Sequence, residues 1–287
     1  MIFIGERING LFKDVAEAIR QRDPRPIQRL AVEQTRAGAS FLDVNTGPAV
    51  DDPASAMPWL VRVIEEVVDT PLCLDSPKPE VIEAGLKAVT KGRPIINSTL
   101  AEREHLERYF PLAREYGAYL IALTMNRRGV SRDAADRLAL AMEIVVAADE
   151  FGFPVRDLFL DPLVLPVNVG QEHIPEVLET LRQIKTLADP PPRTVVGLSN
   201  VSQRCPHRSL LNRTFLAMAM AAGLDAAVAD VLDEELRQVA AAGEILTGRE
   251  IYSEAFLEKG LARREVNAGD RGPGEAVVGD PLVAGGG

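Results

Sequence analysis

Short apolar runs recur along the chain, and amphipathic stretches fill the intervals between them. The runs are three to six residues long and rich in β-branched side chains. Because they lack strict alternation with polar residues, they predict strands that are buried on both faces, and therefore parallel strands covered by helices. Eight such runs occur, at residues 2–4, 41–44, 72–75, 94–97, 119–124, 158–161, 194–199 and 226–230.

The intervals show helical periodicity. Within residues 55–69, apolar side chains recur at i, i+3, i+4 and i+7 and so share one helical face. These side chains are Leu60, Val63, Ile64 and Val67. Farther along, Thr99 and Glu102 have the spacing of a capping box, which predicts that a helix begins there.

Eight strands that alternate with helices in 287 residues predict an α/β fold, a single-domain TIM (β/α)8 barrel. The rival is an open, doubly wound sheet, which more often carries a G-x-G-x-x-G turn after its first strand. No such turn is present. We expect the barrel to occupy residues 1–262. Seven glycines and two prolines fall within residues 264–287, so we expect residues 263–287 to form a disordered tail.

Composition narrows the class of protein. Hydrophobic residues make up 46% and charged residues 26%, as in ordinary globular proteins, and the net charge of −10 argues against binding to nucleic acid phosphates. Cys73 and Cys205 are far apart, which disfavours a disulfide framework or structural zinc site. The N-terminus resembles no signal peptide, and no run of about 18 apolar residues predicts a membrane span. We therefore expect a cytoplasmic protein.

Polar side chains follow every predicted strand. In a barrel the carboxyl ends of the strands converge on one face, where the active site of this fold lies. The polar positions are spaced like βα units, so we expect them to share one rim although the sequence scatters them. They are Glu6, Arg7, Asn9, Asp43, Asn45, Asp75, Ser76, Asn97, Ser98, Asn126, Asp161, Ser199, Asn200 and Asp230, with Met125 beside Asn126.

The rim carries no metal or phosphate motif. His105, His173 and His207 lack the spacing of a metal site, and no glycine-rich phosphate loop is present. The remaining carboxylates and amides suit a flat polar heterocycle, since a carboxylate can accept two parallel N–H bonds from an amino-pyrimidinone edge. Taken one at a time, these side chains could equally be helix caps or turn residues, but capping alone is a poor account of the whole set.

Several motifs carry a family resemblance. They are "GERING", "LDVNTGPAVDD", "LCLDS", "INST", "LTMN", "AADEFG", "DPLVLP", "GLSNVSQ" and "NRTFLAMAMAAGLDAAVAD". With these motifs the chain resembles the methyltetrahydrofolate:corrinoid/iron–sulfur protein methyltransferases over roughly residues 1–262. These enzymes belong to the pterin-binding barrel superfamily, which also holds dihydropteroate synthase and the folate domain of cobalamin-dependent methionine synthase.

The resemblance implies a homodimer that binds 5-methyltetrahydrofolate and passes its methyl group to the Co(I) of a corrinoid. The cobalamin-type corrinoid is supplied by a corrinoid/iron–sulfur protein of the acetyl-CoA pathway, and no metal bound by the chain itself is expected. The implied catalytic residue is Asn200, which would contact N5 of the pterin. The implied pterin contacts are Asp75, Asn97, Asp161, Ser199 and Asn200, and further candidate substrate or partner contacts are Gln203, Arg208, Asp43 and Asn126.

This chemistry accounts for the missing protein nucleophile. A methyl group on a tertiary amine leaves only if N5 is protonated or strongly hydrogen-bonded, and the Asn200 amide can donate such a bond without titrating. The proton can come from solvent, and the nucleophile is the partner's cobalt. The alternatives are methyl transfer to a different corrinoid protein, a dihydropteroate synthase, which needs basic residues for a pyrophosphate, and a non-catalytic folate binder. Methionine synthesis would need a zinc site that two isolated cysteines cannot supply.

Overall fold

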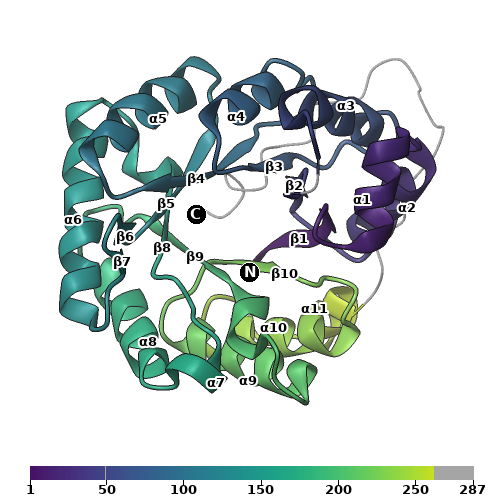
Figure 1. The fold of residues 1–287 in the computed structure, drawn as a ribbon. Coiled ribbons are helices and arrows are strands. Elements are labelled where there is room, and N and C mark those ends of the chain that lie inside the picture. The colour runs from purple at the N-terminus through teal and green to yellow at the C-terminus, as the bar shows by residue number, and fades with distance from the viewer. Residues whose placement is uncertain (49, 262–287) are drawn as a thin grey trace.

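The eight predicted strands close into one barrel. The computed structural model describes residues 1–48 and 50–261, and its main sheet is parallel and closed, in the order β1-β10-β9-β8-β5-β4-β3-β2 (Figure 1). Each predicted run overlaps one strand, so the predicted TIM-type barrel is confirmed. The strands are β1 (Ile2–Asn9), β2 (Phe41–Asn45), β3 (Leu72–Asp75), β4 (Ile95–Leu100), β5 (Tyr119–Leu123), β8 (Leu158–Asp161), β9 (Arg193–Gly197) and β10 (Ala226–Ala229).

Helices surround the barrel, as the view along its axis shows (Figure 1). They follow the strands in the alternation that the periodicity predicts. Two short 3-10 helices, η1 (Val155–Asp157) and η2 (Leu198–Ser202), flank β8 and β9. The α-helices are α1 (Lys13–Gln21), α2 (Pro24–Arg36), α3 (Pro53–Glu65), α4 (Pro79–Leu86), α5 (Arg103–Glu115), α6 (Ala134–Glu150), α7 (Val167–Gly170), α8 (His173–Ile184), α9 (Arg208–Ala221), α10 (Glu234–Leu246) and α11 (Glu254–Leu261).

The helix predicted within residues 55–69 is α3. It begins after Asp52, whose carboxylate accepts a 3.1 Å hydrogen bond from the backbone N–H of Ser55, as an N-cap does. The predicted apolar face is buried at Leu60, Val63 and Ile64. Val67, the last of the four predicted positions, lies beyond the end of the helix and packs against the core half-buried.

The capping box predicted at Thr99 and Glu102 is wrong. Thr99 belongs to β4, which continues to Leu100, so the chain is still extended where the helix was expected to begin. Helix α5 begins at Arg103 without a side-chain cap. The Glu102 carboxylate instead accepts hydrogen bonds from the backbone and guanidinium of Arg127. A contact from a distant loop has replaced the local one.

Side chains fill the interior of the barrel. Tyr119 lies between Phe41 and Phe159, with ring centroids 6.3 and 6.1 Å away in edge-to-face geometry, the arrangement that aromatic pairs favour. The barrel is therefore a packed core and not a pore. Its inner layer consists of Ile4, Phe41, Cys73, Ile95, Tyr119, Ile121, Phe159, Val195 and Ala226.

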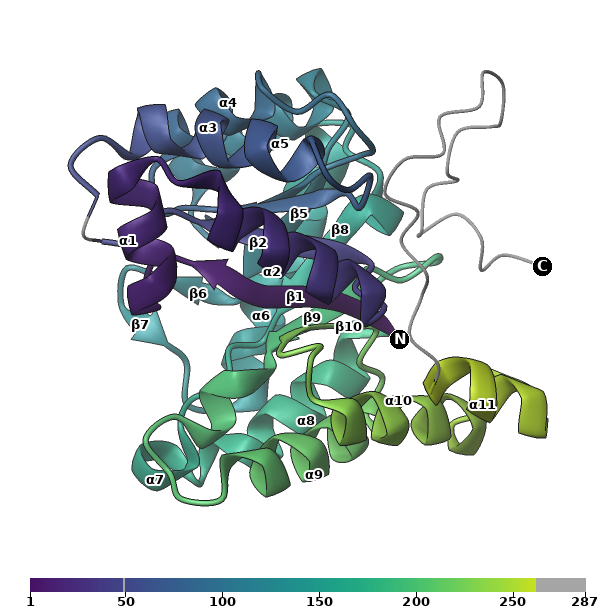
Figure 2. The same ribbon diagram turned by 90° about the vertical axis from the view of Figure 1, so that its right-hand side faces the viewer.

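A small hairpin lies at the carboxyl ends of the strands. In the side view, β1 runs from the N-terminus at the right to the left, where the antiparallel hairpin of β6 (Met125–Asn126) and β7 (Gly129–Val130) also lies (Figure 2).

Among the described residues, no helix is long and apolar enough to cross a membrane. The expected tail, residues 263–287, lies outside the described residues, so the predicted boundary at residue 262 stays a prediction.

Candidate functional site

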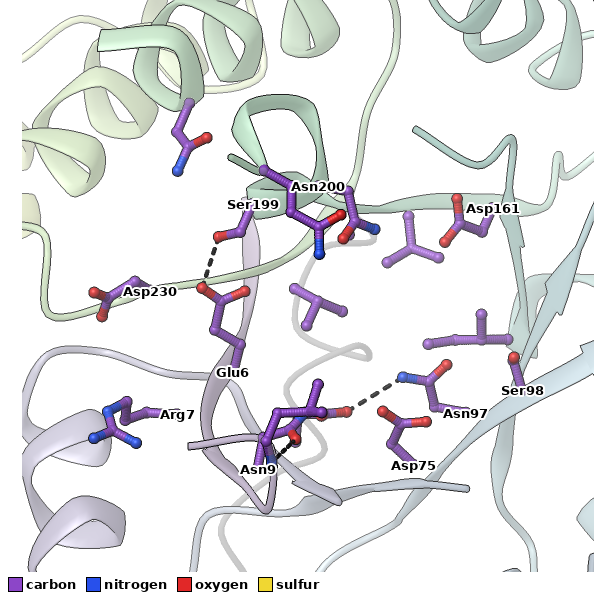
Figure 3. A pocket seen from close by; sticks show the side chains of 18 of the residues that line it. Glu6, Arg7, Asn9, Asp75, Asn97, Ser98, Asp161, Ser199, Asn200 and Asp230 are labelled. Atoms are coloured by element: carbon purple, nitrogen blue, oxygen red, sulfur yellow. Dashed lines mark hydrogen bonds between the residues drawn. The ribbon is translucent and has the colours of Figure 1, made fainter. Parts of the chain in front are cut away.

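A cavity of about 630 Å³ opens at the carboxyl ends of the strands. Its floor is the upper edge of the barrel core, and its walls come from most of the strands and from the start of α9 (Figure 3). The polar side chains that line it are Glu6, Arg7, Asn9, Asp43, Asp75, Asn97, Ser98, Asp161, Ser199, Asn200, Gln203, Arg208, Ser209, Asn212, Asp230 and Asp233, and the apolar ones are Leu11, Phe12, Ile121, Leu123, Val195 and Val228.

Strand register places Asn45, Asp75 and Asn97 side by side on β2, β3 and β4. Asp75 and Asn97 line one wall of the cavity, and Asn45 supports it from the next strand. The Asn45 amide donates a 2.7 Å hydrogen bond to Oδ2 of Asp75, and the Asn97 amide donates one of 3.2 Å to Oδ1 of Asp43. Asp161, at the end of β8, lies beyond Asn97 on the same side of the central space (Figure 3). These bonds fix the wall before any ligand arrives.

The wall holds carboxyl groups that form no ion pair among the described residues. Burial raises the pKa of Asp161 to about 7, although the backbone N–H of Leu163 and the charge of Arg137 act in the opposite direction. Burial likewise raises the pKa of Asp75, and burial together with the neighbouring Asp75 raises that of Asp43 well above its usual value. Buried carboxyl groups without a cationic partner are costly, and they often mark functional sites. A ligand with several N–H donors would satisfy them.

Asn200 reaches the cavity from η2, directly after β9. Its side chain is exposed in the protein alone, and its amide points into the central space (Figure 3). A Cβ on Gly197 would lie 2.7 Å from its Nδ2 atom. The glycine that ends β9 therefore leaves room for the Asn200 amide to fold back over the strand end.

A second polar group lies on the β1 side of the cavity. The hydroxyl of Ser199 donates a 2.6 Å hydrogen bond to Oε1 of Glu6 (Figure 3). Burial raises the pKa of Glu6 to about 7; the bond from Ser199 and the charge of Arg208 lower it, and the charge of Asp230 raises it. Glu6 is thus a carboxyl group that changes its protonation near neutral pH.

Arg208 is held by η2. Its Nε donates a 3.1 Å hydrogen bond to the hydroxyl of Ser202, and its terminal nitrogen donates one of 3.2 Å to the backbone carbonyl of Ser199. Ser202 is fully buried, so it supports Arg208 and does not face the cavity. Gln203 is exposed and lines the cavity.

Turn formation accounts for part of the polar pattern. Asn9, Asn126, Asp161 and Asp230 each accept a hydrogen bond at 2.7 to 3.0 Å from the backbone N–H two residues ahead, as Asx turns do. Asn126 does so within the β6-β7 hairpin and does not line the cavity. Asp161 does both. The turn interpretation and the ligand interpretation are therefore not exclusive.

All candidate residues except Asn126 line the same cavity. The sequence analysis placed Glu6, Arg7, Asn9 and Asp230 on the rim but assigned them no contact, and it missed Ser209, Asn212 and Asp233. Arg7, expected on the rim, and Arg208, a candidate contact, both line the cavity. Arg7 is engaged, since it donates a 2.7 Å bond to Asp14 and lies 4.1 Å over the Phe12 ring.

The residues that the structure describes contain no cluster of histidine, cysteine, aspartate and glutamate that could hold a metal ion. Cys73 is buried in the barrel core and Cys205 lies in the loop before α9, and neither is in a disulfide.

The family model for pterin binding enzymes matches residues 10–230. The chain belongs to this family.

Relatives of this pterin-binding chain include methyltransferases. It is 29% identical over 264 residues to a methylcorrinoid:tetrahydrofolate methyltransferase of Eubacterium limosum, which covers 90% of the chain and 97% of that protein. It is 30% identical over 241 residues to the methionine synthase of Mycobacterium tuberculosis, which covers 79% of the chain. The match spans only 20% of that methionine synthase.

Solved structures share the fold. Dihydropteroate synthase from Thermus thermophilus superposes with a TM-score of 0.59 and 20% identity, over 88% of this chain and 94% of that one. The 7,8-dihydropteroate synthase of Vibrio fischeri superposes with a TM-score of 0.63 and 14% identity, over 87% and 93% of the two chains. At these identities the likeness concerns the barrel alone.

Proposed function

We propose that this enzyme transfers a methyl group between N5 of 5-methyltetrahydrofolate and the cobalt of a corrinoid that another protein carries. The observation that carries the proposal is the division of the cavity. One wall presents the carboxyl groups of Asp75 and Asp161, which form no ion pair among the described residues, and the exposed amide of Asn200 points into the space beside it. The similarity to a methylcorrinoid:tetrahydrofolate methyltransferase over nearly its whole length supports the same reaction.

The wall suits the amino-pyrimidinone edge of a pterin. The Asp161 carboxylate can accept two parallel N–H bonds from that edge, because Leu163 occupies only one of its oxygens. Asp75 and Asn97 flank it on adjacent strands. The ligand's donors would offset the cost that burial imposes on these carboxyl groups in the free protein.

Asn200 would act at N5. A donor against N5 stabilises the state in which the C–N bond breaks and electron density moves to nitrogen. The cobalt of the corrinoid supplies the electron pair for the new bond to carbon, so the chain needs no nucleophile of its own. In agreement with this, no cysteine, histidine or lysine is among the described residues that line the cavity.

We further propose the acceptor that the sequence motifs imply, the Co(I) form of a corrinoid/iron–sulfur protein in the acetyl-CoA pathway, and a homodimeric enzyme. The relative from Eubacterium limosum is named for transfer from methylcorrinoid to tetrahydrofolate. Both directions pass through the same transition state, so the cavity residues would have the same roles in either. Which direction predominates depends on the concentrations in the cell.

A dihydropteroate synthase is the competing assignment, since Arg7 and Arg208 line the cavity. Both guanidinium groups already have partners, Arg7 in Asp14 and Arg208 in η2, although Nη1 of Arg7 has no hydrogen-bond partner among the described residues. They are therefore less available to a pyrophosphate than free cations would be.

Stopped-flow spectroscopy tests the proposal directly. The enzyme is mixed with Co(I) cobalamin and 5-methyltetrahydrofolate, and loss of the Co(I) absorbance is followed. The reverse reaction starts from methylcobalamin and tetrahydrofolate. We expect enzyme-dependent transfer that becomes faster with a purified corrinoid protein. Folate binding without transfer in either direction would indicate a carrier, and condensation of a pterin pyrophosphate with p-aminobenzoate would indicate a dihydropteroate synthase.

A further inference from the structure

Glu6 lies across the central space from the wall that suits the pterin. It rises from β1 toward Ser199 and Asn200, while Asp75, Asn97 and Asp161 lie on the other side (Figure 3). Oε1 accepts the hydrogen bond from Ser199. Among the described residues no group donates a hydrogen bond to Oε2, and Glu6 lines the cavity. One oxygen is thus anchored, and the other is open to a ligand.

Charged groups surround Glu6 on several elements. The negative charge of Asp230, after β10, favours a protonated Glu6. Asp43, on β2, also faces Glu6, and the charge of Glu6 raises the pKa of Asp43. Arg208, at the start of α9, favours the charged form. Arg7, the next residue on β1, is paired with Asp14 on α1. No cation forms an ion pair with Glu6 among the described residues, so burial dominates and its carboxyl group can hold a proton near neutral pH.

We propose that Glu6 exchanges the proton of the folate N5, as the acid when the methyl group leaves and as the base when it returns. This inference rests on the proposed function. In the first direction the O–H bond of Glu6 breaks and an N–H bond forms with the lone pair of N5. The methyl–N5 bond then breaks with its electron pair moving to nitrogen, and Co(I) provides the pair for the Co–C bond. The products are neutral tetrahydrofolate, methyl-Co(III) and the Glu6 carboxylate.

The other polar groups of the cavity are less suited to this role. Asn200 has no proton to give up; it can donate a hydrogen bond to N5 before the proton is transferred, and its amide oxygen can accept the N5–H bond afterwards. Asp161 is bound to the backbone of Leu163 on the pterin wall, and Asp43 accepts its bond from Asn97 with only 2% of its surface exposed. Glu6 alone combines a free oxygen, a position beside Asn200 and a pKa of about 7, which suits both acid and base at neutral pH.

The isosteric Glu6→Gln variant tests the inference. A glutamine can still accept the bond from Ser199 through its carbonyl oxygen, so we expect the melting temperature and the folate dissociation constant to stay close to those of the wild type. The rate constant for methyl transfer to Co(I) cobalamin at pH 6 should fall by roughly 10²-fold or more, the usual contribution of general acid catalysis. We expect the wild-type rate to decline as pH rises through about 7, and this decline should be absent in the variant.

Two further variants make the result specific. Ser199→Ala retains the carboxyl group but removes the bond that favours its charged form, so the midpoint of the pH–rate profile should move to higher pH. Glu104→Gln, an exposed substitution on α5, should change neither rate nor profile. A Glu6→Gln enzyme with the wild-type rate and pH profile would overturn the inference while leaving the proposed function intact. A wild-type enzyme without transfer in either direction would instead overturn the function.

Discussion

The Nδ2 atom of Asn200 lies 2.7 Å from the point where a Cβ on Gly197 would stand. No other residue type at position 197 would leave the Asn200 amide where it is, because a contact below 3.0 Å forces the more flexible partner to move. That partner is the end of an exposed side chain. The conformation of the proposed catalytic amide therefore depends on the residue that ends β9.

Gly197→Ala should reduce methyl transfer without unfolding the protein. The added methyl group displaces the Asn200 amide, and a displacement of about 1 Å can cost roughly 10²-fold in rate. Thermal melting should change little, since the displaced group is exposed. The double variant with Asn200→Ala provides the control. If Gly197 acts through Asn200, adding Gly197→Ala to the Asn200→Ala enzyme causes no further loss of rate. Additive losses would show that Gly197 acts independently.

Asn200→Ala should lower kcat/KM for methyl transfer by roughly 10² to 10³, the usual cost of removing a donor that acts mainly in the transition state. The folded structure should persist because the side chain is exposed. Stopped-flow rates with Co(I) cobalamin measure the loss, and Asn168→Ala, an exposed amide on α7 outside the cavity, serves as the matched control. If kcat/KM fell by only a few-fold, a much smaller loss than expected, Asn200 would have no role in the chemistry.

Asp43 should act through Asn97. Asp43→Ala removes the acceptor of the 3.2 Å bond from the Asn97 amide, and one such bond contributes about 1 kcal/mol, or roughly fivefold in folate affinity if it orients the amide. Asp43→Asn keeps an acceptor oxygen and should retain affinity. Titration calorimetry with tetrahydrofolate distinguishes the two. Equal losses in both variants would mean that the ligand needs the carboxyl group itself.

The barrel and most of its cavity follow from the sequence because both depend on one regular feature. Apolar runs that lack alternation predict parallel strands, and the closed barrel brings whatever follows those strands to one face. Asp75 and Asn97 are 22 positions apart in sequence yet are lateral neighbours in the sheet. The fold, and not any local motif, brings these residues together.

The rest could not be predicted because it depends on contacts between distant segments. The neighbour that orients Glu6 is Ser199, 193 residues away, and burial, which raises the pKa of Glu6, is a property of the assembled cavity. Thr99 and Glu102 match a local capping pattern, but β4 continues through Thr99 and Arg127 engages Glu102. Asn126 follows a strand as the others do, yet its hairpin keeps it out of the cavity.

Asp161→Asn should stabilise the free protein at pH 8 and weaken folate binding. The folded pKa of about 7 lies above the ordinary value of 3.8, so the folded state holds a proton that the unfolded chain has lost between these values. Stability contributed by this group is therefore present below about pH 4 and is lost as pH rises toward 7. At 1.36 kcal/mol per pKa unit the loss is up to about 4 kcal/mol. Asparagine does not ionise, and its oxygen can still accept the Leu163 N–H.

The same titration predicts how folate affinity depends on pH. The pterin edge donates to the carboxylate form, so wild-type affinity should decline as pH falls below about 7. Asp161→Asn should bind roughly tenfold to hundredfold more weakly at pH 8, since bonds to charged groups contribute about 1.5–3 kcal/mol, and its affinity should lose this dependence on pH. Melting temperatures at pH 4 and 8, with calorimetry at pH 6 and 8, measure both effects. A variant that is less stable than wild type at pH 8, or that binds folate equally well, would show that Asp161 is not a buried pterin acceptor.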